Sequence, residues 1–249
     1  MFDNRLLNSL SQTSSDLVRH RLRPVDFVHG DLLAESDTPI RRAIFPRSGL
    51  ISVVVDLEAG ERIEVAMVGS SGAVGGAAIF GPAYHTGTAF AQLPGRAWAM
   101  RVEDLIDVAA ASPEFRQAMC AQEQFLLAQA QQAAACNAKH TIMHRLCSWL
   151  LRAHDACGGA ELLLTQENLA QMLGVQRASV SMVASQLQEK GLIQYRRGRV
   201  HIADADGLAS HACGCHSALR RQHKQLFTET INADTAPRKG EATLSAEAR

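Results

Sequence analysis

The sequence contains no long apolar run, since no stretch approaches the roughly 18 consecutive apolar residues that a membrane-spanning helix requires. The first ten residues are amphipathic and lack the continuous apolar segment of a secretory signal. We therefore expect a cytoplasmic protein. With 249 residues, of which 47% are hydrophobic, the chain can form one large domain or two ordinary ones with buried cores.

Motifs of catalysis are also missing. The chain has no nucleophile elbow, no glycine-rich phosphate-binding loop and no paired carboxylates at a spacing typical of acid–base chemistry. These absences argue against an enzyme, and we predict neither a catalytic residue nor a cofactor.

Cysteine is absent from the first 119 residues and occurs six times after them. Several of the six lie within helical patterns, and a chain of this size does not need disulfides to hold its fold. We therefore interpret all six as reduced thiols: Cys120, Cys136, Cys147, Cys157, Cys213 and Cys215.

Charge shows no excess of one sign, with 25 Lys and Arg residues against 25 Asp and Glu residues. The net charge therefore gives no global indication of nucleic acid. Locally, Arg196, Arg197 and Arg199 form a basic cluster, which is the more informative pattern.

From about residue 25 to residue 100, short β-rich runs alternate with Gly, Pro, Asp and Ser. The clearest runs are residues 50–55, 63–68 and 96–100, with a turn over residues 56–61. Many short strands at regular spacing predict an antiparallel sandwich or barrel. A short helical segment is expected before it, over residues 4–20.

A long helical region begins at Ser112, where a capping serine, a proline in the first turn and Glu114 form a helix start. No Gly or Pro follows until Gly158, and we divide this run near residues 137–141 into a long helix and a shorter one. An apolar stripe on the long helix suits packing against its own domain or in a dimer: Phe115, Met119, Leu126 and Ala133.

A helix-turn-helix pattern follows at residues 165–190. The first helix begins with Thr165 as its cap and ends at Gly174, which suits a turn that needs positive φ. Its apolar face consists of Leu169, Met172 and Leu173, and the inward face of the second helix consists of Val180, Val183 and Leu187. Two short helices joined by a turn containing glycine define the motif, although an ordinary helical hairpin gives the same pattern.

A basic hairpin comes directly after these helices. Residues 192–195 and 200–202 are predicted strands, and Arg196-Arg197-Gly198-Arg199 forms the turn between them. Such a wing can lie over a phosphate backbone, whose contacts position a protein while contacts to base edges specify the sequence. We predict these DNA-binding residues: Thr165, Gln176, Arg177, Ser179, Ser181, Arg196, Arg197 and Arg199.

At these residues the sequence resembles the Crp/Fnr superfamily of bacterial transcription regulators. Residues 164–175 resemble the first helix and turn of its DNA-binding domain, residues 191–199 resemble the wing, and the similarity extends from about Asn4 to Cys215. The resemblance implies an α+β fold with an N-terminal antiparallel β-roll of the cyclic-nucleotide-binding type, a long dimerisation helix and a C-terminal winged helix-turn-helix. It favours the dimer interpretation of the long helix.

The resemblance also implies a domain organisation and partners. We expect a β-roll sensory domain over residues 1–111, a dimerisation helix over 112–140 and a winged helix-turn-helix over 141–216. A C-terminal extension over 217–249 follows, disordered from about residue 232. A homodimer would read a pseudo-palindromic operator in double-stranded DNA, with half-sites about one helical turn apart, and would contact RNA polymerase.

The chain departs from the cyclic-nucleotide-binding members of the family. Those members share a Glu that binds the ribose hydroxyl and an Arg that pairs with the cyclic phosphate. Here Gly76 stands at the Glu position, and Gly87 or Thr86 stands at the Arg position. The oxygen-sensing branch has an N-terminal cysteine cluster for an iron–sulfur centre, which this chain lacks. We therefore expect neither cyclic-nucleotide binding nor that iron–sulfur centre, and the effector-binding residues stay unassigned.

The second helix of the motif departs from the family as well. In cAMP-type members, an Arg and a Glu at its start and an Arg one turn later read the half-site. Arg177 is retained here, but Ala178 replaces the Glu and Met182 replaces the second Arg. Ser179 and Ser181 remain as polar groups. We therefore expect an operator that differs from the cAMP-type sequence.

Two groups of Cys and His residues have metal-ligand side chains. The first is His211, Cys213, Cys215 and His216, whose spacing is not that of a zinc knuckle and whose members are too close in sequence to reach one ion easily. The second lies at roughly helical spacing and consists of Cys136, His140, His144 and Cys147. We interpret both groups as structural or surface residues and predict no metal. A metal- or redox-responsive regulator that uses them as its sensor is the alternative function, and a constitutive dimer is the third.

Overall fold

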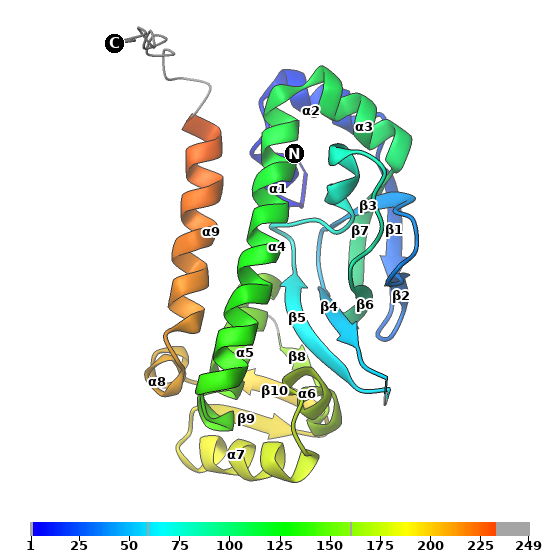
Figure 1. Ribbon diagram of the computed structural model, residues 1–249. Coiled ribbons are helices and arrows are strands. Elements are labelled where there is room, and N and C mark those ends of the chain that lie inside the picture. The colour runs from blue at the N-terminus through cyan, green and yellow to red at the C-terminus, as the bar shows by residue number, and fades with distance from the viewer. Residues whose placement is uncertain (1, 59, 160, 233–249) are drawn as a thin grey trace, which may run out of the picture.

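The computed structural model describes residues 2–58, 60–159 and 161–232. A β-rich N-terminal part lies along one long helix, and a smaller helical part with a hairpin lies at the far end of that helix (Figure 1). This arrangement confirms the predicted α+β fold class.

The N-terminal segment forms two short helices, α1 (Arg5–Asn8) and α2 (Gln12–Arg19). Leu6, Leu7 and Leu10 are buried, as the apolar spacing of residues 4–20 predicts. Asn4 caps α1 and also donates from Nδ2 to the carbonyls of Pro46 and Gly72, which ties the helix to the β-roll.

The β-roll consists of two antiparallel sheets. One has the order β1 (Arg23–Phe27), β7 (Gly95–Arg101) and β3 (Arg42–Pro46). The other has the order β2 (Leu32–Ala34), β6 (Thr88–Leu93), β4 (Leu50–Asp56) and β5 (Arg62–Val68). The three runs that looked β-rich in the sequence are therefore strands, and a single 3₁₀ turn, η1 (Gly76–Phe80), follows β5.

Two helices leave the β-roll, α3 (Val102–Ala111) and the long α4 (Pro113–Lys139). Ser112 caps α4 by accepting a hydrogen bond from the Phe115 amide, as expected. The helix ends at Lys139 and α5 (Ile142–Cys157) begins after the cap Thr141, so the predicted division at residues 137–141 is confirmed.

The apolar stripe of α4 packs on the chain's own core rather than facing outward. Phe115 and Met119 are fully buried against α1, α2 and α3, and Leu126 packs on the sheet residues Phe27 and Ile51. These three residues therefore pack within the chain, which is one of the two packings expected for the stripe, since intramolecular helix packing has the same spacing as a dimer seam. A different face of α4 remains uncovered and carries residues at alternating intervals of four and three: Cys120, Gln124, Leu127, Gln131, Ala134 and Ala138.

The C-terminal part contains α6 (Gln166–Leu173), α7 (Arg177–Glu189) and a small sheet with the order β8 (Leu162–Leu163), β10 (Arg199–Ile202) and β9 (Ile193–Arg196). Its core joins Leu146 and Leu150 of α5 to the inner faces of α6 and α7, and it continues to Leu50 and Met67 of the β-roll.

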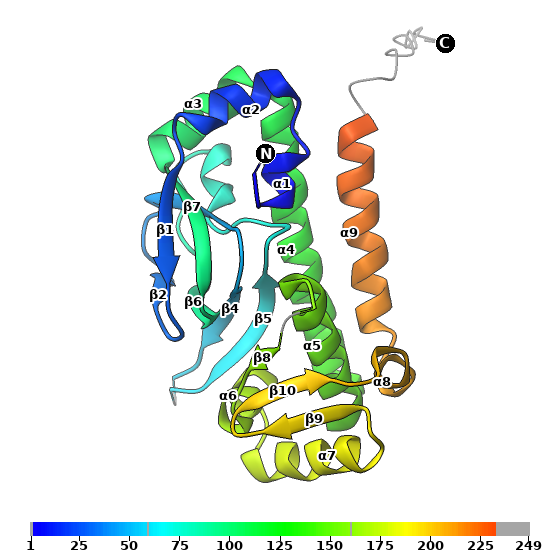
Figure 2. The ribbon, with the colours of Figure 1, turned by 180° about the vertical axis from the view of Figure 1, so that it is seen from behind.

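The chain then forms α8 (Ala205–His211) and α9 (Cys215–Asn232). Helix α9 runs back along α4, as both views show (Figures 1 and 2). The Phe125 ring of α4 meets the His223 ring edge-on, with 4.9 Å between centroids. This helix was not foreseen in the sequence, and the tail that we expected to be disordered lies outside the described residues.

None of the helices among the described residues combines the length and apolar character that crossing a membrane would require.

Candidate functional site

The helix-turn-helix is built as its sequence predicts. Thr165 caps α6 and forms a reciprocal capping box with Asn168. Gly174 ends the helix at φ 60°, a left-handed conformation that glycine adopts at low cost. The side chains of Val180, Val183 and Leu187 are buried, so the other face of α7 is left for contacts outside the chain.

The exposed face of α7 contains part of the predicted reading set. Gln176 and Arg177 are exposed at the helix start, and Ser179 is half-buried. Ser181 is half-buried and donates its hydroxyl hydrogen bond to Gln166 Oε1 of α6, so this hydroxyl holds the two helices together. Met182, which we left out of the reading set, is 60% exposed in the middle of the same face.

The wing is a tight hairpin. Arg197 and Gly198 occupy the two central positions at φ 52° and 73°, the pattern of a type I′ turn. Glycine suits the second position, whereas an arginine at positive φ is uncommon and costs conformational energy. Arg197 is exposed at the tip of the hairpin.

The predicted wing arginines differ in their partners. Arg196 and Arg197 are exposed, and neither forms an ion pair with another of the described residues. Arg199 instead forms an ion pair with Glu161, with 2.7 Å between Nη1 and Oε2. A phosphate contact from Arg199 would compete with that carboxylate.

A groove connects the wing to the helix-turn-helix. Thr165, Gln166, Arg177 and Arg197 line it, together with Tyr195. Tyr195 donates its hydroxyl hydrogen bond to the Leu164 carbonyl at 2.8 Å, which fixes the hairpin against the start of α6. The structure thus brings Arg177 of the helix and Arg197 of the wing to one concave surface.

In the β-roll, Gly76 and Gly87 are tightly packed. A Cβ at Gly76 would collide with the Met119 side chain and lie 2.6 Å from Glu123 Oε1, both from α4. Burial raises the pKa of Glu123 to about 7. A Cβ at Gly87 would lie 2.9 Å from the Val54 carbonyl oxygen. Side chains of α4 therefore occupy the space beside Gly76.

A buried polar group joins the β-roll to the helical part. Glu64 of β5 accepts hydrogen bonds from Ser52 Oγ at 2.6 Å and from Trp149 Nε1 of α5 at 2.8 Å. Arg152, also of α5, is half-buried nearby and donates to Gln129 Oε1 of α4 at 2.7 Å. Burial raises the pKa of Glu64 to about 7, although Arg152 acts in the opposite direction.

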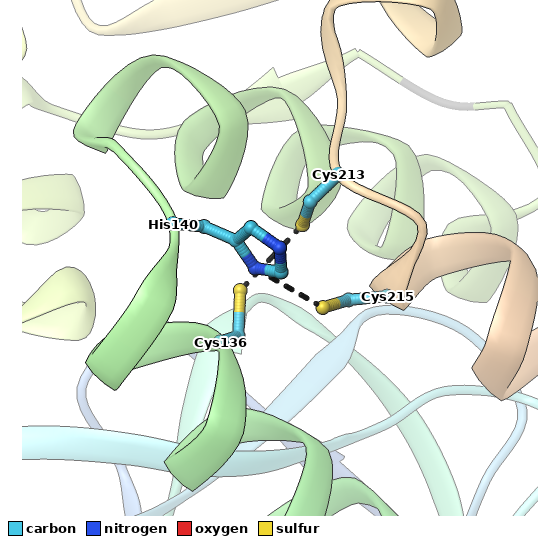
Figure 3. A group of neighbouring side chains, drawn as sticks. All are labelled: Cys136, His140, Cys213 and Cys215. Atoms are coloured by element: carbon cyan, nitrogen blue, oxygen red, sulfur yellow. Dashed lines mark hydrogen bonds between the residues drawn. The ribbon is translucent and has the colours of Figure 1, made fainter.

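The Cys and His residues assemble differently from either group considered in the sequence. Cys136 and His140 at the end of α4 meet Cys213 and Cys215 at the start of α9 (Figure 3). These four residues are the Cys/His cluster. Their ligand atoms all lie within 4.8 Å of one another.

The remaining candidates lie elsewhere. His211 bonds to the Gly207 carbonyl through Nδ1 and lies 2.8 Å from Lys190 Nζ through Nε2. His216 Nε2 lies 2.8 Å from Asp155 Oδ2 of α5. The sequence singled out all four members of the Cys/His cluster, but it divided them between two groups and gave no signal that the groups meet.

The sulfur atoms of the Cys/His cluster interact directly. Cys136 Sγ and Cys213 Sγ are 3.6 Å apart, and their hydrogen bond lowers the pKa of Cys213 while it raises the pKa of Cys136. Cys215 Sγ lies 3.5 Å from His140 Nδ1. Cys213 and Cys215 are buried, whereas Cys136 and His140 are half-buried.

Two family models match the chain: the cyclic nucleotide-binding domain over residues 24–112 and the Crp-like helix-turn-helix domain over residues 144–211. No curated protein matches it.

Solved structures share the fold. FixK2 from Bradyrhizobium japonicum is 18% identical with a TM-score of 0.66, over 77% of this chain and 98% of that chain. TTHB099, a CRP-family transcriptional regulator from Thermus thermophilus, is 22% identical with a TM-score of 0.63, over 76% and 96%. The c-di-GMP-responsive regulator CLP from Xanthomonas campestris is 16% identical with a TM-score of 0.63, over 77% and 99%.

Proposed function

Since the chain belongs to the Crp/Fnr superfamily of transcription regulators, we propose that it binds a pseudo-palindromic operator as a homodimer. The observation that carries this proposal is the concave surface shared by Arg177 and Arg197. Helix α7 enters the major groove, and the wing follows the adjacent phosphates. Arg196 and Arg197 supply the phosphate contacts, since Arg199 is paired with Glu161.

The two-fold axis of the homodimer runs beside α4. One face of this helix is covered by the chain's own core and a second by α9, while the row that includes Leu127 is uncovered. Leu127 is 59% exposed, and its neighbours in the row are small or polar. Their alternating spacing of four and three is that of a two-helix seam.

The signal that this regulator senses is not a cyclic nucleotide. Neither charged residue of the nucleotide site is present, since Gly76 stands at the Glu position and Gly87 or Thr86 at the Arg position. Met119 and Glu123 of α4 occupy the space beside Gly76. A metal- or redox-responsive regulator is the second candidate, which the Cys/His cluster favours. In either case we place the protein in the cytoplasm with DNA and RNA polymerase as its partners.

Genome-wide mapping of binding sites tests the proposed function. We expect enriched sequences with two-fold symmetry, whose half-sites are centred about one helical turn apart. Fluorescence anisotropy with a recovered site should give a complex of two chains per duplex. Enrichment without symmetry, or binding that does not depend on sequence, would contradict the homodimeric operator-binding function.

Replacing Arg177 with Ala should separate base reading from phosphate contact. A bidentate arginine–guanine contact discriminates by about 1–3 kcal/mol in each half-site, so with both half-sites affected operator affinity should fall by at least roughly 30-fold while non-specific affinity changes much less. Arg196→Ala is the matched control and should weaken binding to all sequences alike. Binding of both variants to single-base operator variants decides the outcome. Uniform weakening by Arg177→Ala would leave Gln176, Ser179 and Met182 as the reading residues.

Replacing Arg197 with Gly should weaken DNA binding without weakening the fold. Glycine adopts the φ of 52° freely, so the free energy of unfolding should stay equal or rise by up to about 1 kcal/mol. The slope of log K against log salt should drop by about two units for the homodimer, one for each chain. Arg196→Gly removes the same charge from strand β9, where glycine should cost roughly 0.5–1 kcal/mol. Equal thermal destabilisation of the two variants would show that Arg197 is not strained.

A further inference from the structure

The ligand atoms of the Cys/His cluster have the spacing of a tetrahedral zinc site. With zinc–sulfur bonds of about 2.3 Å and zinc–nitrogen bonds of about 2.0 Å, tetrahedral geometry places two sulfurs about 3.8 Å apart and sulfur and nitrogen about 3.5 Å apart. The Cys136–Cys213 sulfur distance is 3.6 Å, and the distance from Cys215 Sγ to His140 Nδ1 is 3.5 Å. We propose that the Cys/His cluster binds one zinc ion.

The donor set and its construction favour this metal. Three thiolates and one imidazole are soft and borderline ligands, which select zinc over the hard cations. Four protein ligands fill a tetrahedral site and leave no open position, as in structural rather than catalytic zinc sites. Cys136 and His140 are separated by four positions at a helix end, and Cys213 and Cys215 by two, so each pair converges from a short segment of chain.

Charge around the Cys/His cluster suits a bound ion. Zinc with three thiolates has a net charge of minus one. Arg145 and Arg152 of α5 interact electrostatically with Cys136 and Cys213 and can balance that charge. Gln132 Nε2 donates to Cys215 Sγ at 3.1 Å, and such outer hydrogen bonds orient metal ligands.

The position of the Cys/His cluster gives the ion a specific task. His140 and Thr141 form the junction between α4 and the DNA-binding part, and Cys213 and Cys215 form the junction between α8 and α9. An ion held by both junctions fixes the helix-turn-helix and α9 relative to α4. This consequence rests on the proposed function, because the orientation of α7 in each subunit sets the half-site spacing.

Metal analysis of the purified full chain tests the site directly. After incubation with zinc under reducing conditions and removal of free ions, we expect about one zinc ion per chain. Cobalt(II) substitution should give thiolate-to-metal charge-transfer bands and the visible bands of a tetrahedral site. His140→Asn and Cys213→Ser should weaken zinc binding by at least about 10-fold, the loss already typical of residues that only support ligands. His144→Asn and Cys120→Ser are matched controls and should leave it unchanged.

The opposite results would overturn the zinc site. These are no bound zinc in the folded, reduced protein, a Cys136–Cys213 disulfide in place of metal, iron with inorganic sulfide, or equal zinc affinity in the four variants. His140→Asn keeps the test decisive if Cys213→Ser fails to fold, since His140 is half-buried at a helix end.

Operator binding is measured separately on zinc-loaded and chelator-treated protein. We expect at least a 10-fold loss of affinity without zinc, restored when zinc is added back. Zinc binding without any operator binding would reject the proposed function and leave the metal site standing. Equal operator affinity with and without zinc would overturn the coupling of the ion to DNA binding.

Discussion

Leu127→Glu should convert the proposed homodimer into monomers and lower operator affinity by about two to four orders of magnitude. A dimer binds its second half-site as an intramolecular event, whose effective concentration commonly adds about 10²- to 10⁴-fold to the affinity. Two glutamates facing each other across the seam would repel and would lose water without gaining partners. Leu127 is 59% exposed in the single chain, so the folded monomer should tolerate the charge. Analytical ultracentrifugation and fluorescence anisotropy measure the two effects.

Two matched variants distinguish the seam from general damage. Ile106→Glu introduces the same charge at an apolar residue of α3 that is 45% exposed and should leave both assembly and operator affinity unchanged. Leu126→Glu places the charge against the sheet core, so it should lower the melting temperature instead. A fully dimeric Leu127→Glu protein would reject this face of α4 as the interface.

The helix-turn-helix and the wing could be predicted from sequence because local residues determine them. Thr165 and Gly174 mark the ends of α6 through backbone preferences that do not depend on the rest of the chain. Gly198 marks the turn between β9 and β10 in the same way, although the positive φ of Arg197 does not follow from the preferences of arginine. The sequence therefore predicts that the surface they form is basic, although it does not predict the shape of that surface.

The face of α4 that we propose for assembly could not be predicted, because a heptad-like stripe does not say what it packs against. Phe115, Met119 and Leu126 match a coiled-coil seam, yet the β-roll and the N-terminal helices cover them. The row around Leu127 contains glutamine and alanine and gives a weak apolar signal. Only the positions of the elements packed around α4 distinguish its covered face from its uncovered face.

The Cys/His cluster was missed for a related reason. Cys136 and Cys213 are 77 positions apart, and each half alone has too few ligands at a suitable spacing. The return of α9 along α4 brings the halves together, and that helix follows from tertiary packing rather than from a local motif. Likewise, the charged sequence around Glu64 gave no indication that this side chain is buried between the β-roll and α5.

The buried Glu64 should make stability depend on pH. Burial raises its pKa from 4.5 to about 7, so the folded protein keeps a proton that the unfolded chain releases between these values. The free energy of unfolding should therefore contain a contribution that is fully present below pH 4.5 and is lost as the pH rises through 7. A difference of about 2.5 between the two pKa values corresponds to roughly 3 kcal/mol.

Glu64→Gln isolates this contribution, because the amide resembles the protonated acid and can still accept from Trp149 and donate to Ser52. At pH 8 the variant should be more stable than the wild type by roughly 3 kcal/mol, or about 6–12 °C in melting temperature, whereas at pH 4.5 the two should be equal. The comparison cancels the contributions of Glu123, His85 and His223, which both proteins share. A difference in melting temperature that is the same at both pH values would mean that Glu64 stays ionised in the fold, stabilised by the Arg152 guanidinium.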